Sequence, residues 1–251
     1  MPGVLSKPGD VWTITLDNPP ANTWGWEQLE GVSSALDEAE QSSAHVVVFR
    51  SGGRFFSTGV DISLIERVAT TSDTTEIGEF GRALQSRFRR IEGLTAPTVA
   101  LIQGHALGGG LEFALACDLR IAEESARMGL PEAKLGLLPG AGGTQRLTRE
   151  AGRGTALRLI LTGELVSARW AEQHGLVQFC LPDGQGDTGC HELVESLTAI
   201  PRGSLAASKR SIALAYSDEG FATEIEQTQE LLRAPETVSR LNAFLNRSNK
   251  K

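Results

Sequence analysis

A run of three glycines between an apolar strand and an apolar helix constrains the fold of this chain more than any other feature. Residues 97–102 (PTVALI) are predicted to form a strand, and residues 105–118 (HALGGGLEFALACD) place glycines 108–110 at the start of a helix. The first N–H groups of a helix have no acceptor within it, and the helix dipole adds about half a positive charge there. Because glycine also lets a ligand oxygen approach the main chain closely, this turn is predicted to bind negative charge.

A second glycine-bounded segment lies earlier in the chain, over residues 53–61 (GRFFSTGVD). It follows an apolar strand predicted over residues 46–50, which Gly52 and Gly53 break. Together with glycines 108–110, this segment is predicted to form one oxyanion-binding site. Preorganised main-chain N–H groups stabilise the oxyanion that a thioester carbonyl becomes during reaction. The two segments therefore indicate an enzyme that acts on acyl thioesters.

The rest of the first 190 residues alternates between strand and helix patterns. Residues 11–16 (VWTITL) alternate as a strand does, and residues 24–41 and 77–91 have helical apolar spacing. Repeated strand-then-helix units with glycine at the crossings predict an α/β core with parallel strand pairing. Residues 1–190 are therefore expected to form a single catalytic core.

The last part of the chain has a different pattern, because strand signals end at about residue 188. Residues 191–251 are predicted to form a helical region. Its predicted helices cover residues 192–200, 204–216, 221–233 and 236–247.

Charge and composition exclude several classes of protein. The net charge of −7 and the pI of about 5.2 disfavour a nucleic-acid-binding surface. The three cysteines are widely spaced and predict reduced thiols and no structural metal site. No apolar run approaches the roughly 18 residues needed to span a membrane, and the N-terminal segment has no signal-peptide pattern. A cytoplasmic protein is therefore expected.

Three ordered motifs resemble those of the enoyl-CoA hydratase/isomerase (crotonase) superfamily, and the resemblance extends from about residue 11 to residue 182. The motifs are residues 53–61, residues 104–112 (GHALGGGLE) and residues 130–147 (LPEAKLGLLPGAGGTQRL). The resemblance implies the family's spiral of strand-strand-helix repeats. It also implies that the C-terminal helices pack against neighbouring subunits, in a trimer or a dimer of trimers.

The same resemblance implies the residues of the site. Matched position by position, the oxyanion N–H groups belong to Val60 and Gly109, and the catalytic carboxylates are Glu112 and Glu132. Asp61 and Gly140 match positions near the site. The substrate is expected to be an acyl-CoA, so coenzyme A enters with the substrate, and no separate cofactor or metal is implied.

Each of these residues also has a purely structural interpretation. An acidic residue in the first turn of a helix suits the dipole, so Glu112 alone, or Glu132 after Pro131, would more often be structural. Both glutamates together, beside a glycine-rich oxyanion element, favour catalysis. Asp61 has a simpler role as the cap of the next short helix, and Gly140 as part of a tight turn.

Other kinds of site fit the sequence less well. Residues 140–143 (GAGG) lack the Gly-Lys-Ser/Thr ending of a phosphate-binding loop and are interpreted as a turn that leads into a helix at Thr144. Ser57 lacks the leading glycine of a nucleophile elbow, which disfavours a serine hydrolase. His105 is expected to be a hydrogen-bonded structural residue, and Cys117 to be a packing residue.

Retention of both glutamates favours a hydratase, because hydration needs one group to deprotonate water and another to protonate the α-carbon. Family members with isomerase, hydrolase or decarboxylase activity often keep at most one of the two. The leading hypothesis is therefore an enoyl-CoA hydratase. An enoyl-CoA isomerase or other crotonase-type chemistry is the alternative, and a non-catalytic assembly subunit is a third reading.

Overall fold

The computed structural model describes residues 3–248, and its strands form two sheets. The larger sheet has six strands in the order β1-β2-β3-β5-β7-β10, and the smaller has four in the order β4-β6-β8-β9. Pairing is parallel except between β1 and β2 and between β8 and β9. The strands of the larger sheet are β1 (Gly3–Lys7), β2 (Val11–Asp17), β3 (Val46–Ser51), β5 (Thr98–Ile102), β7 (Leu119–Glu123) and β10 (Phe179–Leu181). Those of the smaller are β4 (Phe55–Ser57), β6 (His105–Leu107), β8 (Arg127–Gly129) and β9 (Val166–Ser167).

The chain winds between the two sheets as a spiral. In each of the pairs β3/β4, β5/β6 and β7/β8, the first strand joins the larger sheet and the second joins the smaller. Helices follow each pair: α2 (Ile62–Thr71) and α3 (Thr75–Gly93), then α4 (Gly109–Ala114), then the 3₁₀ helix η1 (Pro131–Leu135) and α5 (Gly143–Thr162). The predicted α/β fold with strand-strand-helix repeats is confirmed. The edge strand β1 was not predicted from the sequence.

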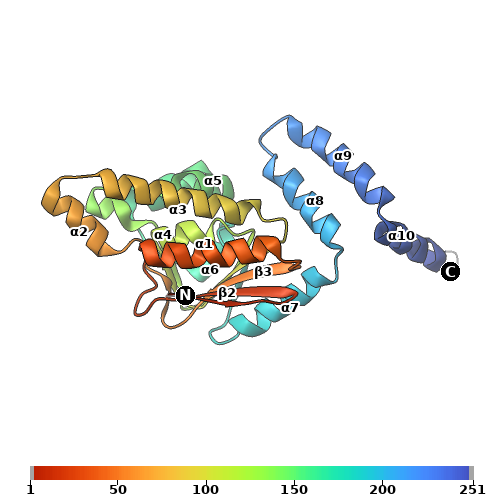
Figure 1. Cartoon of the computed structure of the whole chain (residues 1–251), viewed down its shortest axis with the longest axis horizontal. Coiled ribbons are helices and arrows are strands. Elements are labelled where there is room, and N and C mark those ends of the chain that lie inside the picture. Colours follow the sequence, from red (N-terminus) through yellow and green to blue (C-terminus); the bar gives the residue numbers. More distant parts are fainter. Residues whose placement is uncertain (1–2, 249–251) are drawn as a thin grey trace.

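Burial explains why these segments form these elements. All residues of β5 are buried, as expected for a central parallel strand, and β2 alternates between half-buried and buried positions. Helix α1 (Trp26–Gln41) buries Leu29, Val32 and Leu36 at helical spacing and packs with α3 on one side of the larger sheet. Figure 1 shows α1 and α3 side by side, with α1 next to β2 and β3.

An aromatic cluster lies beneath the short helix α4. The ring of Phe113 contacts those of Trp24, Phe49, Phe56 and Phe88, with centroids 5.0 to 5.9 Å apart. All five side chains are fully buried. The cluster fixes the depth and orientation of α4, and therefore of the glycine turn that begins it.

Helix α7 (Gly186–Thr198) spans the boundary expected at residue 190, and it packs on the outer face of the larger sheet. There it buries Cys190 and Val194 against side chains of β3, β5 and β7. The expected regions 1–190 and 191–251 also include residues 1–2 and 249–251, which lie outside the described residues. Within the described residues no helix is long and apolar enough to cross a membrane.

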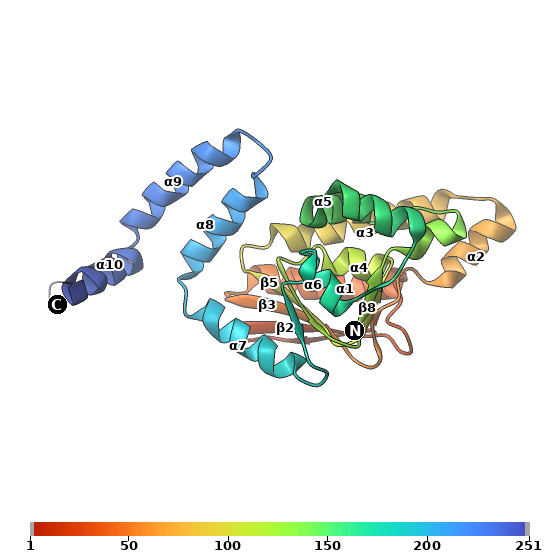
Figure 2. The same cartoon turned by 180° about the vertical axis from the view of Figure 1, so that it is seen from behind.

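The last three helices of the described chain extend away from the core, as Figures 1 and 2 show. They are α8 (Arg202–Ala213), α9 (Glu219–Arg233) and α10 (Pro235–Ser248), close to the predicted ranges. The Lys209 ammonium forms an ion pair of 2.7 Å with Asp118 and so ties α8 to the core. Large apolar side chains are exposed on these helices: Ile212, Phe221, Ile225, Leu232, Leu241, Phe244 and Leu245.

Candidate active site

The two glycine segments lie side by side at the ends of β4 and β6. Gly59 and Gly108 have positive φ angles of +95° and +54°, which glycine adopts without strain. A Cβ atom on Gly59 would lie 3.2 Å from the Gly109 nitrogen, and one on Gly110 only 2.2 Å from the Ser57 carbonyl oxygen. The two main chains therefore approach as closely as they do because these positions carry no side chain.

This approach brings together the two N–H groups expected from the sequence. Trp24 uses its N–H and carbonyl groups to bond Gly59 and Asp61, so the Val60 N–H between them points away from Trp24. Gly109 is the first residue of α4, and its N–H has no acceptor within the helix. A Cβ atom on Gly109 would lie 3.7 Å from the Val60 nitrogen. Among the described residues, neither N–H donates a hydrogen bond.

Glu112 lies one turn further along α4 and is 1% exposed. Its Oε1 accepts hydrogen bonds from the N–H groups of Ala141 (2.8 Å) and Gly143 (2.7 Å). Ala141 lies in the loop that leads into α5, and Gly143 is the first residue of that helix. Within the described residues Oε2 has no hydrogen-bond partner, so one oxygen is held and the other is left for a bound molecule.

The pKa of Glu112 is raised from about 4.5 to about 7, and burial is the largest cause. The negative charge of Glu132 also raises this pKa, whereas the two N–H bonds and the nearby Arg146 charge partly offset the rise. A carboxyl group with a pKa near 7 can both accept and release a proton close to neutral pH.

Glu132 is the second residue of η1, whose start is fixed by Pro131. A Cβ atom on Gly108 would lie 2.9 Å from its Oε1, so the Glu132 carboxyl lies directly against the oxyanion turn. Its Oε2 is buried and has no hydrogen-bond partner among residues 3–248, and burial raises the pKa of this group too. The structure therefore brings together the two glutamates and the two N–H groups that the sequence indicated.

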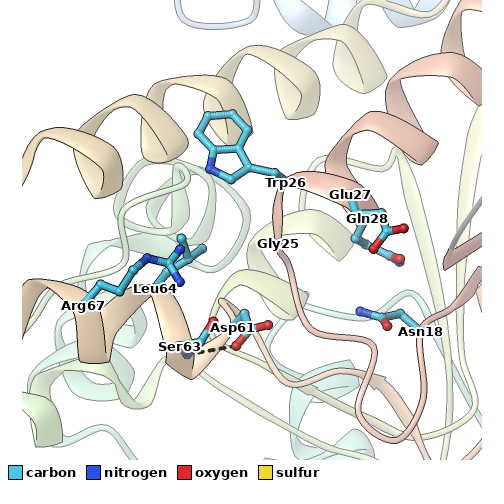
Figure 3. Close-up of a pocket in the computed structure, with 9 residues that line it drawn as sticks. All are labelled: Asn18, Gly25, Trp26, Glu27, Gln28, Asp61, Ser63, Leu64 and Arg67. Atoms are coloured by element: carbon cyan, nitrogen blue, oxygen red, sulfur yellow. Dashed lines mark hydrogen bonds between the residues drawn. The ribbon is translucent and has the colours of Figure 1, made fainter.

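Asp61 and Gly140 lie at the margins of this arrangement. The Asp61 side chain accepts a hydrogen bond of 2.9 Å from the Ser63 N–H and caps α2, as the sequence predicted. It also lines a cavity of about 290 Å³ between α1 and α2, with Trp26 and Arg67 (Figure 3). The Gly140 carbonyl accepts a hydrogen bond of 2.7 Å from the Gln85 side chain of α3.

The other polar candidates have structural partners. His105 Nδ1 accepts a bond of 3.1 Å from the Arg127 N–H, and burial together with Arg54 and Arg127 lowers its pKa. Ser57 is fully buried and accepts a hydrogen bond from the Gly59 N–H.

Cys117 is a buried free thiol, and burial raises its pKa to about 12. Among the described residues, no group of three or more His, Cys, Asp or Glu side chains is arranged to hold a metal ion.

Sequence reasoning missed the groups that hold Glu112. Ala141 and Gly143 supply the N–H donors, and Arg146 binds the carbonyl of Ala141 at 2.8 Å. A glycine-rich turn before a helix was visible, and it signals free N–H donors. No local pattern indicated that these donors face a carboxylate that lies 29 and 31 residues earlier in the chain.

Known proteins resemble this chain in sequence and in fold. A family model described as enoyl-CoA hydratase/isomerase matches residues 6–249. A probable enoyl-CoA hydratase of Bacillus subtilis (strain 168) is 38% identical over 219 residues, which cover 85% of this chain and 81% of that protein. The short-chain-enoyl-CoA hydratase of Clostridium acetobutylicum is 32% identical over 97% of this chain and 98% of its own length.

Solved structures agree with this likeness. The enoyl-CoA hydratase of Bacillus anthracis matches with a TM-score of 0.90 and 30% identity, over 98% of this chain and 96% of that one. DspI of Pseudomonas aeruginosa matches with a TM-score of 0.91 and 33% identity, over 98% of this chain and 95% of that one. The chain belongs to the enoyl-CoA hydratase/isomerase family and is an enzyme of crotonase type. The family implies that it binds an acyl-CoA substrate.

The raised pKa of Glu112 predicts a dependence of stability on pH. The folded chain keeps a proton on Glu112 up to about pH 7, while the unfolded chain loses it near pH 4.5. Glu112 therefore costs stability increasingly as pH rises through this window, by roughly 3 kcal/mol in total. The Glu112→Gln variant lacks this cost, and we expect its unfolding free energy relative to the parent to rise by about that amount between pH 4.5 and pH 8. Denaturant unfolding of both proteins at the two pH values measures it, and an unchanged difference would contradict a raised pKa.

Proposed function

We propose that this protein is an enoyl-CoA hydratase, which adds water across the 2,3 double bond of a 2-enoyl-CoA to give a 3-hydroxyacyl-CoA. The observation that carries the proposal is the pair of carboxyl groups, Glu112 and Glu132, beside the unpaired N–H groups of Val60 and Gly109. Hydration requires both elements at one place. The relatives named as hydratases support this reading.

The N–H groups act on the thioester carbonyl. When the oxygen of water bonds to C3, the electrons of the double bond move toward the carbonyl, which becomes an oxyanion. The N–H groups of Val60 and Gly109 receive this charge, at roughly 3 kcal/mol or more for each donor in comparable sites. Coenzyme A takes part as the carrier of the acyl group, and the proposal includes no further cofactor.

The two carboxyl groups handle the protons. One carboxylate accepts a proton from the attacking water, and the other carboxyl group delivers a proton to C2, so that water is added in total. Glu112 suits such an exchange because its pKa is about 7 and its Oε1 is held in place by two N–H groups. Placed acid and base groups contribute about 10² to 10⁴-fold each.

The first test replaces each glutamate by glutamine, which keeps the shape and removes proton transfer. For both Glu112→Gln and Glu132→Gln we expect roughly 10² to 10⁴-fold slower turnover of crotonyl-CoA with KM largely kept. The double variant should lose much less than the product of the single losses, because the two groups act as a unit. Loss of the conjugated enoyl-thioester absorbance measures hydration.

The same variants separate hydration from isomerisation. An isomerase moves a proton between C2 and C4 and can use one carboxylate, so one of the two variants would keep substantial activity on a 3-enoyl-CoA. Isomerisation creates the conjugated absorbance that hydration removes. A Glu112→Gln enzyme that hydrates crotonyl-CoA at nearly the parental rate would refute the paired mechanism. A parent that is inert toward a panel of acyl-CoAs would instead favour a non-catalytic subunit.

A second test removes one main-chain donor. Proline is tolerated at the first position of a helix, so Gly109→Pro removes the N–H with little effect on α4 itself. We expect at least about 10²-fold slower turnover. Gly109→Ala is the matched control, because its added Cβ meets the same neighbour, Trp24 Cδ1 at 3.3 Å, while the N–H remains. Equal turnover in the two variants would show that this N–H is not a donor.

The proposed enzyme assembles as a trimer or a dimer of trimers. Support comes from the apolar side chains that α9 and α10 expose, such as Phe221, Leu232 and Leu241. Exposed apolar surface of this extent on protruding helices is costly in water unless another chain covers it. Light scattering of the full chain should give the mass of three or six copies. A stable monomer at micromolar concentration would contradict this part of the proposal.

A further inference from the structure

Arg146 is a nearly buried cation next to the site, and its guanidinium is bonded on two sides. It is 7% exposed and lies in the first turns of α5. Its Nε and Nη2 donate to the two carboxylate oxygens of Glu92, near the end of α3, at 2.9 and 2.8 Å. Its Nη1 donates to the carbonyl of Ala141 at 2.8 Å. Planar bidentate pairing of this kind fixes a guanidinium in orientation as well as position.

The carbonyl that Arg146 binds belongs to the loop that holds Glu112. The N–H of the same residue, Ala141, donates to Glu112 Oε1. The loop turns at Gly142, whose φ is +108°, and a Cβ atom there would lie only 2.2 Å from Arg146 Nη1. The guanidinium therefore packs directly on the turn. A continuous chain of hydrogen bonds leads from Glu92 through Arg146 and the loop to Glu112.

We propose that Arg146 and Glu92 are positioning residues for the general acid/base Glu112, which rests on the function proposed above. The ion pair with Glu92 fixes the Arg146 guanidinium, which in turn holds residues 139–143 in place. The N–H groups of Ala141 and Gly143 can then donate to Oε1 of Glu112, and Oε2 is left for the reacting molecule. Neither residue touches the reacting atoms. Their role is to fix where the Glu112 carboxyl stands.

The charges around Glu112 predict the direction of a pH effect. Glu132 on η1 faces Glu112 and favours its neutral form, whereas Arg146 on α5 and the loop N–H groups favour its charged form. Arg89 and Arg149 line the same cavity of about 280 Å³ as Arg146 and the loop residues 139–142. Loss of Arg146 removes a cation and loosens two donors, so both effects should raise the pKa of Glu112.

The test compares Arg146→Gln, Arg146→Lys and Glu92→Gln with Arg90→Gln. Arg90 is the matched control, because it is a paired arginine on α3, the helix that carries Glu92. It forms ion pairs with Asp37 and Glu40, and no hydrogen bond joins it to the loop among the described residues. For Arg146→Gln we expect roughly 10 to 100-fold lower kcat on crotonyl-CoA, with KM changed by less than about threefold. The limb of its pH profile that reports the protonation of Glu112 should move to higher pH. Glu92→Gln should change kcat and the pH profile in the same direction but by less. Arg90→Gln should leave kcat and the pH profile unchanged.

Arg146→Lys separates charge from geometry. Lysine keeps the cation but lacks the planar guanidinium that bonds Glu92 and the Ala141 carbonyl at the same time. Compared with Arg146→Gln, the Arg146→Lys variant should therefore have a pH profile closer to that of the parent, while its kcat recovers less. If Arg146→Gln does not fold, Glu92→Gln carries the test, because it keeps an acceptor for the guanidinium. A folded Arg146→Gln or Glu92→Gln enzyme with parental kcat and pH profile, or equal losses in Arg90→Gln, would overturn the proposal.

One readout does not depend on catalysis. The carboxyl band of Glu112 in infrared difference spectra, assigned by its loss in Glu112→Gln, reports the pKa of this group directly. Arg146→Gln should shift the titration of that band to higher pH. If the parent has no hydratase activity, the proposed function fails, yet the band still decides whether Arg146 positions Glu112. An unshifted band in a folded Arg146→Gln protein would overturn the positioning role.

Discussion

The close approach of two main-chain segments is the constraint on which the site depends. Ser57, Gly59 and Val60 lie against glycines 108–110 at distances that admit no Cβ atom on Gly110. Parallel pairing of β4 with β6 brings the segments together, and the aromatic cluster under Phe113 supports α4 from below. Two N–H groups are thereby set side by side before any ligand arrives. Such preorganisation matters because donors that need not move at the moment of reaction stabilise new charge most effectively.

Burial of a carboxyl group beside those donors creates an electrostatic balance. Taking Glu112 out of water disfavours its charge, and Glu132 adds to this, while two N–H bonds and Arg146 offset part of the cost. The outcome is a pKa of about 7, far from that of an exposed glutamate yet within reach of neutral pH. The stability lost by burying Glu112 is thus tied to the property that fits it for proton transfer.

Local patterns explain how much of this could be predicted from sequence. The strand-glycine-helix order and the positions of Glu112 and Glu132 follow from short windows and a family resemblance, and the cap at Asp61 needs only its own helix start. The support of Glu112 was not predictable in this way. Arg146 meets Glu92 across 54 residues, and such contacts leave no periodic or motif signal. Strand β1 was missed because residues 3–7 (GVLSK) carry little apolar alternation.

The C-terminal helices show where the core ends in physical terms. Helix α7 belongs to the core, because Cys190 and Val194 complete an apolar cluster on the outer face of the larger sheet. The next helices are joined to the core by polar contacts, such as Lys209 with Asp118 and Tyr216 with the Arg149 carbonyl. Polar contacts of this kind orient a segment more than they stabilise it. Large apolar side chains of α9 and α10 are therefore exposed rather than packed on the core, whereas Ala141 and Arg146, which help to hold Glu112, are buried within it.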